Sequence, residues 1–347
     1  MSLQPTVSRR MLGILLALVL ASALLPGCGS KKATSEPSPT APVTAPPAAT
    51  TPAPVKEPPP APKLPGAVAV MIDNHVDAVP QSGLDKADIV YEMEAEGGIT
   101  RFMALFYRES AEKVGPVRSA RMGFYDIAYA YGLPYVHVGG NYDVLLELKN
   151  RNRRLLNVDD MTGTGGSFWR TTDRKAPHND YTSTTRIVNW ANEVKFGFKP
   201  LAFFPEGPAP AGGKPVTAVA FTWGPKSQDV IWTWNGMRFE RSQSGVPHVT
   251  DTGARIQADN LVVLFTKFVW DQKVQDGEGE YHVSIVGSGS GYFYRDGKVI
   301  PIQWKKTAKE EPYTFTTAAG ESVPFGPGQT WVEVLKSPEH VTQGAPQ

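Results

Sequence analysis

The sequence predicts a mixed α/β (α+β) N-terminal domain followed by a β-rich C-terminal domain. Residues 66–205 alternate short apolar runs, typical of strands, with segments of helical spacing, which indicates a mixed α/β domain. Residues 214–337 carry many short apolar runs separated by turn dipeptides, with little helical periodicity. The Pro- and Gly-rich stretch 205–214 marks the boundary, and we expect residues 338–347 to form a tail.

The N-terminus has the pattern of a secretory signal. Arg9 and Arg10 precede an uncharged apolar run of about 15 residues, shorter than the roughly 20 residues of a membrane-spanning helix. Cys28 follows in a setting that resembles a lipobox, and it is the only cysteine, so no disulfide can form within the chain. We therefore expect residues 1–27 to be a lipoprotein signal peptide and Cys28 to carry the lipid. An uncleaved anchor or a chance cysteine is the alternative, and the two arginines leave the general secretory and twin-arginine export routes both open.

Residues 28–65 are dominated by proline, alanine and threonine. Of the chain's 31 prolines, 12 fall between residues 31 and 65. Such a composition cannot bury a core and favours extended conformations. We expect a disordered stalk that holds the folded part away from a bilayer. The expected location is therefore the extracytoplasmic face of the cell membrane, with the lipid on Cys28 as the contact to the membrane.

The charge balance excludes one class of partner. The chain has 35 Lys and Arg residues against 34 Asp and Glu. Removing residues 1–27 takes away Arg9 and Arg10 and no acids, which leaves 33 basic against 34 acidic residues, a net charge of −1. Because nucleic-acid binding requires a strong positive excess, the sequence predicts no nucleic-acid partner.

Local signals predict the elements of the N-terminal domain in order. The run 67–72 is typical of a buried strand, and the Gly97-Gly98 doublet between apolar runs predicts a hairpin over 88–109. Pro116 in a first turn would start a helix over 117–131. Further along, we expect a strand at 135–138, a helix at 144–149, and a helix that Thr182 or Ser183 caps and that runs to about residue 194.

The C-terminal domain has strand patterns at 216–221, 231–234, 237–240, 261–266, 281–286, 291–294, 299–304 and 331–335. Asn235-Gly236 and Asp296-Gly297 are strong hairpin signals, because both central positions of such turns need positive φ. Five of the tryptophans of this domain could stack on sugars or peptides, but core packing is the expected role of each: Trp223, Trp232, Trp234, Trp304 and Trp331.

The hairpin over 88–109 is unusual in its charges. With a two-residue loop at Gly97-Gly98, Glu94 would lie directly opposite Arg101, and Glu92 and Glu96 would share their face. Three carboxylates beside one guanidinium, on a face that also holds apolar residues, predict a polar cleft that is partly covered. An ordinary solvated face of an antiparallel sheet is the alternative.

Other polar residues gather where strands end, which is where ligands bind in open α/β sheets. The candidate ligand-binding residues are Asp73 and Asn74 after the first strand, Arg101 in the hairpin, Arg118 and Arg121 on one face of the next helix, and Asn179 before a helix start. The candidate acids and bases are Glu92, Glu94, His137 and His178. A turn, exposed helix charges and a buried histidine are the ordinary roles of such residues.

Several signatures are missing from the sequence. There is no Walker loop, dinucleotide fingerprint, H-E-x-x-H motif or nucleophile elbow, and the glycine-rich stretch 163–167 lacks the lysine of a phosphate loop. No zinc spacing exists around a single cysteine. Asp73, Glu92 and Glu94 could hold Ca²⁺ or Mg²⁺, but carboxylates beside arginines are more often ion-pair networks. We therefore expect no metal and no cofactor.

Six segments in order resemble the YerB-like lipoprotein family. They are VMIDNH (70–75), QSGLDKADIVYE (81–92), EGGITR (96–101), GPVRSAR (115–121), HVGG (137–140) and APHN (176–179). That family is classed as a domain of unknown function with a separate C-terminal domain. The resemblance covers residues 66–335, and it implies a bacterial surface lipoprotein without supplying a reaction.

Two functions remain open at this point. The first is a non-catalytic envelope lipoprotein that binds a cell-wall polymer, another envelope component or a protein partner through the charged cleft. The second is a hydrolase or transferase acting on an anionic envelope substrate, with Glu92 or Glu94 and a histidine in acid and base roles and the arginines holding the anion. Whether the protein is an enzyme stays undecided.

Overall fold

The computed structural model describes residues 64–150, 154–164, 166–199, 201, 203–224, 228–271 and 279–344. The expected signal peptide, Cys28 and all but the last two residues of the expected stalk lie outside the described residues. Within the described ranges, none of the helices has the length and apolar character needed to cross a membrane.

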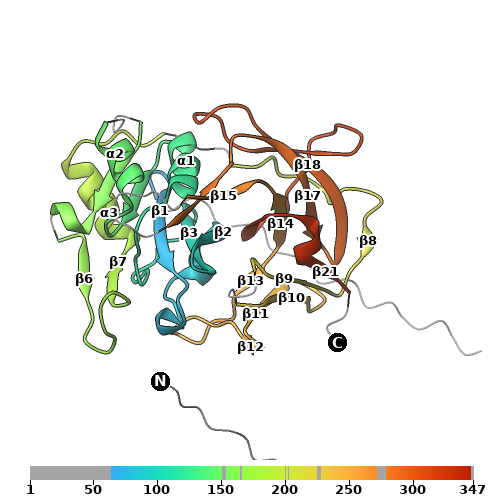
Figure 1. Ribbon diagram of the computed structural model, residues 1–347, viewed down its shortest axis with the longest axis horizontal. Helices are drawn as coiled ribbons and strands as arrows, with labels where there is room; N and C mark the ends of the chain where they lie inside the picture. The colour runs from blue at the N-terminus through green and yellow to red at the C-terminus, as the bar shows by residue number, and fades with distance from the viewer. Residues whose placement is uncertain are drawn as a thin grey trace, which may run out of the picture. The chain divides into compact units, whose positions relative to one another are not determined.

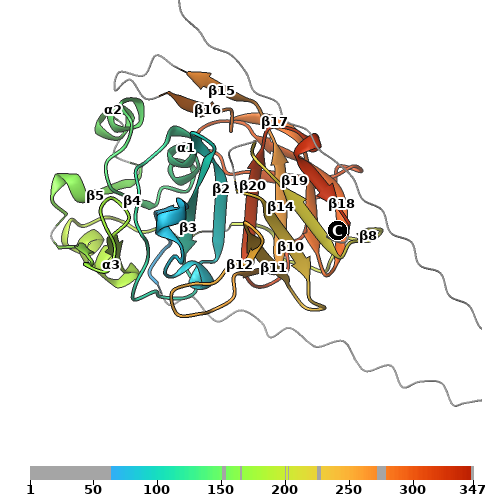
Figure 2. The same cartoon turned by 60° about the horizontal axis from the view of Figure 1, so that its bottom comes forward.

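One mixed sheet, of 11 strands over the described residues, runs through both halves of the chain. Its order is β19 (Thr314–Thr317), β18 (Lys298–Lys306), β17 (Gly287–Arg295), β14 (Asn260–Phe265), β20 (Thr330–Leu335), β2 (Ile89–Glu96), β3 (Ile99–Phe106), β1 (Val68–Asp73), β4 (Pro134–His137) and β5 (Leu156–Asp159), and β8 (Lys214–Pro215) pairs with β18. Figure 2 shows β20 between β2 and β14, and β20 is parallel to both. The N-terminal and C-terminal segments therefore share a single sheet.

A second sheet of six described strands contains only C-terminal residues. Its order is β12 (Val246–Pro247), β11 (Phe239–Gln243), β10 (Val230–Trp234), β9 (Ala218–Phe221) and β21 (Val341–Gln343), and β13 (Gln257–Ala258) pairs with β11. The expected tail over 338–347 is wrong in part, because β21 pairs with β9, with Val341 opposite Phe221. Two further pairs are β15 (Phe268–Asp271) with β16 (Glu280–Val283), and β6 (Phe168–Arg170) with β7 (Asp180–Thr182).

The α-helices of the described chain all belong to the N-terminal segment (Figure 1). They are α1 (Met122–Tyr131), α2 (Tyr142–Asn150) and α3 (Thr184–Glu193), and the short 3₁₀ turns are η1 (Val76–Ala78), η2 (Leu84–Lys86), η3 (Asp160–Thr162) and η4 (Pro338–His340). Ser183 is the N-cap of α3, because its hydroxyl accepts a hydrogen bond from the Arg186 backbone N–H (3.2 Å), which confirms the predicted cap.

The helix predicted over 117–131 begins only at Met122, and the preceding segment is extended. The backbone of this extended segment lies between the ends of β1 and β4. The Arg118 N–H donates to the Met71 carbonyl (3.0 Å), and the Arg118 carbonyl accepts from the Val138 N–H (3.2 Å). These hydrogen bonds to two strands replace those of a first helical turn. The expectation that Arg118 and Arg121 share a helix face is therefore wrong, although both stay at the end of the same strands.

Apolar side chains fill the space on both faces of the large sheet. Alternate residues of β1 enter different cores: Val68 and Val70 pack with Ile187 of α3, and Ala69 and Met71 pack with Phe124 of α1. The first core also contains Trp232 of the second sheet, and the second also contains Val332 of β20. The predicted class, a mixed α/β region followed by a strand-rich region, is confirmed, but both cores extend across the two segments.

The β2–β3 hairpin has a bulge that the sequence pattern did not predict. Glu96 lies opposite Ile99 as expected, but the register shifts at Ala95, so Glu94 lies opposite Thr100 and Arg101 lies opposite Met93. One extra residue in a strand sends every side chain beyond it to the other face. The predicted pair of Glu94 and Arg101 is therefore wrong. β2 is also buried on both faces up to its last residue, which excludes an ordinary solvated face.

Candidate functional site

The polar residues that gather at one edge of the large sheet do so because of its topology. β1, β4 and β5 are parallel, so their carboxyl ends, at Asp73, His137 and Asp159, lie at the same edge. Arg101, at the start of antiparallel β3, lies there too, opposite Asp73. From β1 the chain proceeds to β2 and β3 on one side, and from β4 it proceeds to β5 on the other. Ligands bind at such a switch point in open α/β sheets.

Asp73 is the centre of the first group of side chains at this edge. Its carboxylate is almost fully buried, and Oδ2 lies 2.7 Å from Nδ1 of His178 and 3.1 Å from Nε of Arg118. The other oxygen, Oδ1, accepts the backbone N–H of His75 (2.9 Å). A carboxylate at Nδ1 fixes the tautomer in which neutral His178 carries its proton on Nδ1 and its lone pair on Nε2. Within the described chain, no residue hydrogen-bonds that Nε2.

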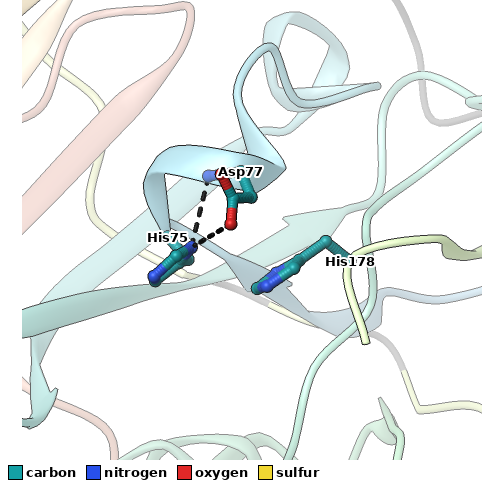
Figure 3. A group of neighbouring side chains, drawn as sticks. All are labelled: His75, Asp77 and His178. Carbon is teal, nitrogen blue, oxygen red and sulfur yellow. Dashed lines mark hydrogen bonds and ion pairs between the residues drawn. The ribbon is translucent and has the colours of Figure 1, made fainter. Parts of the chain in front are cut away.

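His75 stacks on His178 at the surface of this group (Figure 3). The ring centroids are 4.8 Å apart and the planes differ by 16°. Together with Asp77, the two histidines place potential metal ligand atoms within 4.8 Å of one another. However, the lone pairs of nearly parallel rings run side by side, whereas a zinc ion needs nitrogens that converge at about 2.0–2.1 Å. The arrangement is that of a stacked pair, and the expected absence of a metal stays a prediction.

A second group joins the first through Arg101. The guanidinium of Arg101 pairs with Glu96 and donates to the carbonyl of Ser119 (2.9 Å). Arg121 donates to both oxygens of Glu96, from Nε at 2.9 Å and from Nη2 at 2.7 Å. Burial raises the pKa of Glu96, but Arg101 and Arg121 outweigh it and the pKa is lowered. Burial, then Arg121, lowers the pKa of Arg101 to about 10, so that it remains charged at neutral pH.

We call these residues the arginine–histidine cluster: Asp73, His75, Glu96, Arg101, Arg118, Arg121 and His178. Its three guanidinium groups exceed its two carboxylates, and Asp77 lies on the exposed rim. The side chains of Arg118 and Arg121 keep 26% and 14% of their surface exposed, so solvent reaches both. Positive charge, N–H donors and imidazoles at a strand edge form a site suited to an anion. Five of the predicted site residues, Asp73, Arg101, Arg118, Arg121 and His178, are brought together here.

Glu92, a predicted acid or base, lies elsewhere in a fully buried polar network. Its Oε2 pairs with Arg241 of β11 at 2.8 Å, and its Oε1 accepts from Thr100 (2.6 Å) and from Asn74 (3.2 Å). Burial, then the neighbouring Glu92 carboxylate, raises the pKa of Glu333 well above its usual range. The buried network therefore places two carboxyl groups, those of Glu92 and Glu333, beside the single guanidinium of Arg241. Glu92 and Asn74 join the two sheets and are out of reach of a solvent-borne ligand.

The remaining predicted site residues are also outside the cluster. His137 is fully buried between the Gly139 carbonyl and Asn157, and burial lowers its pKa, as for an ordinary core histidine. Asn179 accepts from Arg170 and donates to the Thr171 carbonyl, which shapes its loop. Glu94 pairs with Lys336 (2.7 Å) in a separate cavity.

The sequence patterns missed several residues that matter here. His75 is not among the predicted site residues, because the sequence does not show that its ring stacks on His178, which lies far along the chain. Arg241 is not predicted either, because the strand expected at 237–240 ends before it, whereas β11 extends to Gln243. In the observed β11, Phe239, Arg241 and Gln243 alternate toward the core, and a charged residue at such a position indicates a buried partner.

The chain belongs to a class of proteins that is defined by family models. The chain matches the model "Protein of unknown function (DUF3048) N-terminal domain" over residues 54–197 and the corresponding C-terminal domain model over residues 218–332. These matches cover most of the chain, which therefore belongs to the DUF3048 family. The resemblance inferred from the six motifs is confirmed.

A particular relative comes from Bacillus subtilis (strain 168). The protein described as "Putative lipoprotein YerB" is 31% identical over 275 residues, which cover 77% of this chain and 80% of that protein. The crystal structure of YerB from the same species matches with a TM-score of 0.70 at 28% identity, over 81% of this chain and 94% of that one. The two-part organisation of this chain therefore matches a solved relative.

Proposed function

We propose that this protein is a lipid-anchored lipoprotein of the cell envelope that binds an anionic envelope component through the arginine–histidine cluster. The name of the Bacillus relative and the lipobox-like setting of Cys28 support the anchor. One observation carries the binding role: three guanidinium groups gather around two carboxylates at the sheet edge where the parallel strands end. A wall polymer that bears phosphate or carboxylate groups fits this charge, and so does an acidic segment of a protein partner.

A binding experiment with a phosphate polymer tests this role. The purified protein is titrated with a glycerol-phosphate oligomer, with neutral dextran as the comparison polymer. We expect Arg118→Gln and Arg121→Gln each to weaken binding by roughly 10- to 100-fold, the value of a charge-assisted hydrogen bond. Binding should also weaken as salt rises, because these charges are partly exposed.

Arg238→Gln is the matched control. It removes the same charge from a side chain that pairs with Asp259 and is 43% exposed, away from the cluster. If Arg118→Gln, Arg121→Gln and Arg238→Gln bind the oligomer equally well, the cluster is not the binding site. If the wild type binds no better than it binds dextran, an acidic protein segment becomes the probe for the same variants.

The alternative, an acid/base hydrolase or transferase, has one specific observation in its favour. The 2.7 Å contact between Asp73 and His178 is the arrangement of a general base with its orienting carboxylate. If this is its role, His178→Gln abolishes turnover of the glycerol-phosphate oligomer and leaves the melting temperature near that of the wild type. Wild-type protein that releases no product from the oligomer would exclude this activity on that substrate.

A further inference from the structure

A cavity of about 490 Å³ lies beside the β2–β3 turn, and no residue of the arginine–histidine cluster lines it. Glu94 of β2 and the turn residues Gly97 and Gly98 line one part of it. Trp270 of β15, Tyr281 of β16 and Lys336, which directly follows β20, line another. With Gly224, which also lines it, four separate segments of the chain form this cavity, which has the size of a small-ligand site.

Trp270 is exceptional among the tryptophans of the C-terminal segment. Its surface is 43% exposed, whereas Trp234 is half-buried and Trp223, Trp232, Trp304 and Trp331 are buried. Its ring is nevertheless supported: the Tyr281 ring meets it edge to face at 4.9 Å. The backbone of Gly279 approaches so closely that an added Cβ would lie 2.1 Å from the indole. A large aromatic side chain held in place at the wall of a cavity is suited to stacking.

The charged groups of the cavity neutralise each other. Glu94 is almost fully buried, and its carboxylate lies 2.7 Å from the Lys336 ammonium. That ammonium also lies 4.3 Å from the centroid of the Tyr281 ring and donates to the Tyr281 hydroxyl (3.3 Å). The Lys336 ammonium therefore takes the place of a cation over the Tyr281 ring and repels a second cation, and the Glu94 carboxylate disfavours an anion. An uncharged ligand with hydroxyl groups remains.

We propose that this cavity binds a neutral saccharide ring. The apolar face of a pyranose stacks on Trp270, and its hydroxyls donate to the Glu94 carboxylate and accept from the Lys336 ammonium. A buried acceptor and a half-buried donor beside an aromatic wall form the combination that fixes a ring of this kind. The site is separate from the arginine–histidine cluster, and its role does not depend on the function proposed for the cluster.

Calorimetric titration of the full chain with three neutral trisaccharides tests this proposal. The probes are N-acetylchitotriose, cellotriose and maltotriose. We expect at least one to bind, and Trp270→Ala to weaken that binding about tenfold, the loss of one aromatic stacking contact. Val269→Ala is the matched control, because the neighbouring exposed side chain points to the other face of the strand. It should bind as the wild type does.

A second variant keeps the proposal testable if Trp270→Ala does not fold, as its melting curve would show. Glu94→Gln has nearly the same shape and should weaken binding of the same trisaccharide by a similar factor, because it removes the charged acceptor. Binding of none of the three probes to the wild type overturns the proposal. So does a folded Trp270→Ala protein that binds as tightly as Val269→Ala, or a folded Glu94→Gln protein with wild-type affinity.

Discussion

Replacing Arg241 by methionine should destabilise the fold more than any replacement of its exposed arginines. Arg241 and Glu92 are both fully buried and 2.8 Å apart, and the guanidinium also lies over the rings of Phe102 and Trp331 at 5.4 and 5.3 Å. Removing it leaves the Glu92 carboxylate without a counter-charge. Breaking a buried pair in this way costs about 3–5 kcal/mol, or a fall in melting temperature of roughly 10 °C for a chain of this size.

Three variants separate this explanation from a simple loss of packing. The double variant Glu92→Gln/Arg241→Met should recover most of the loss, because no unpaired charge remains. Lys86→Met, which breaks an ion pair with Glu109 that is exposed on both sides, should cost less than about 1 kcal/mol. Glu333→Gln, which resembles the protonated acid, should be at least as stable as the wild type at pH 7.

The pH dependence of Glu333→Gln adds a further check. The raised pKa of Glu333 means that the unfolded chain releases its proton above pH 4.5 and the folded chain does not, so wild-type stability falls as pH rises from there. The advantage of the variant should therefore shrink as pH is lowered toward 4.5. Urea unfolding at several pH values measures all these differences. The reasoning would be refuted if the unfolding free energy of Arg241→Met were within about 1 kcal/mol of the wild-type value. It would also be refuted if the double variant were no more stable than Arg241→Met.

Other predictions concern single contacts. Burial, then Arg241, holds the pKa of His248 well below 6.5, so the unfolded state alone takes up a proton as pH falls and stability is lost below pH 6.5. As pH falls from 6.5 to 5.5, the unfolding free energy of His248→Gln, measured with urea, should rise relative to that of the wild type by up to about 1.4 kcal/mol per pH unit. A difference between the two proteins that does not change with pH would contradict this. Ser183→Ala should cost about 1 kcal/mol of unfolding free energy through the lost cap of α3, and Ser183→Thr should cost less. Gly132→Ala should lower the melting temperature by several degrees, because φ is +64° there and a Cβ would lie 2.9 Å from the Arg154 carbonyl oxygen, whereas an unchanged value would show that the turn can relax.

Much of the fold could be predicted because its signals are local. The capping serine of α3, the Asp296-Gly297 turn between β17 and β18, and the buried strand β1 all follow from a few neighbouring residues. The sharing of one sheet could not be predicted, since the β2–β20 pairing sets Ile89 opposite Thr330, far apart in sequence. No residue pattern in β2 or β20 indicates which strand it pairs with.

The candidate site was predicted in part for the same reason. Asp73 and His178 come together because strand ends and loops meet at a sheet edge, a general property of such folds. The separation of Arg101 from Glu92 and Glu94 depends on the single extra residue at Ala95, and a bulge has no strong composition signal. Trp270 illustrates another limit, because exposure of an aromatic residue is set by what packs beside it and not by its neighbours in sequence.

The central position of β20 in the large sheet has a consequence for folding during synthesis. Its partners β2 and β14 are made long before it, and each presents an unpaired edge until β20 is available. On a ribosome the sheet can therefore not close until nearly the whole chain has emerged, and a product that stops before Thr330 would carry two open edges prone to aggregation. A chain whose sheet closes this late would stay unfolded, and accessible to chaperones, for most of its synthesis.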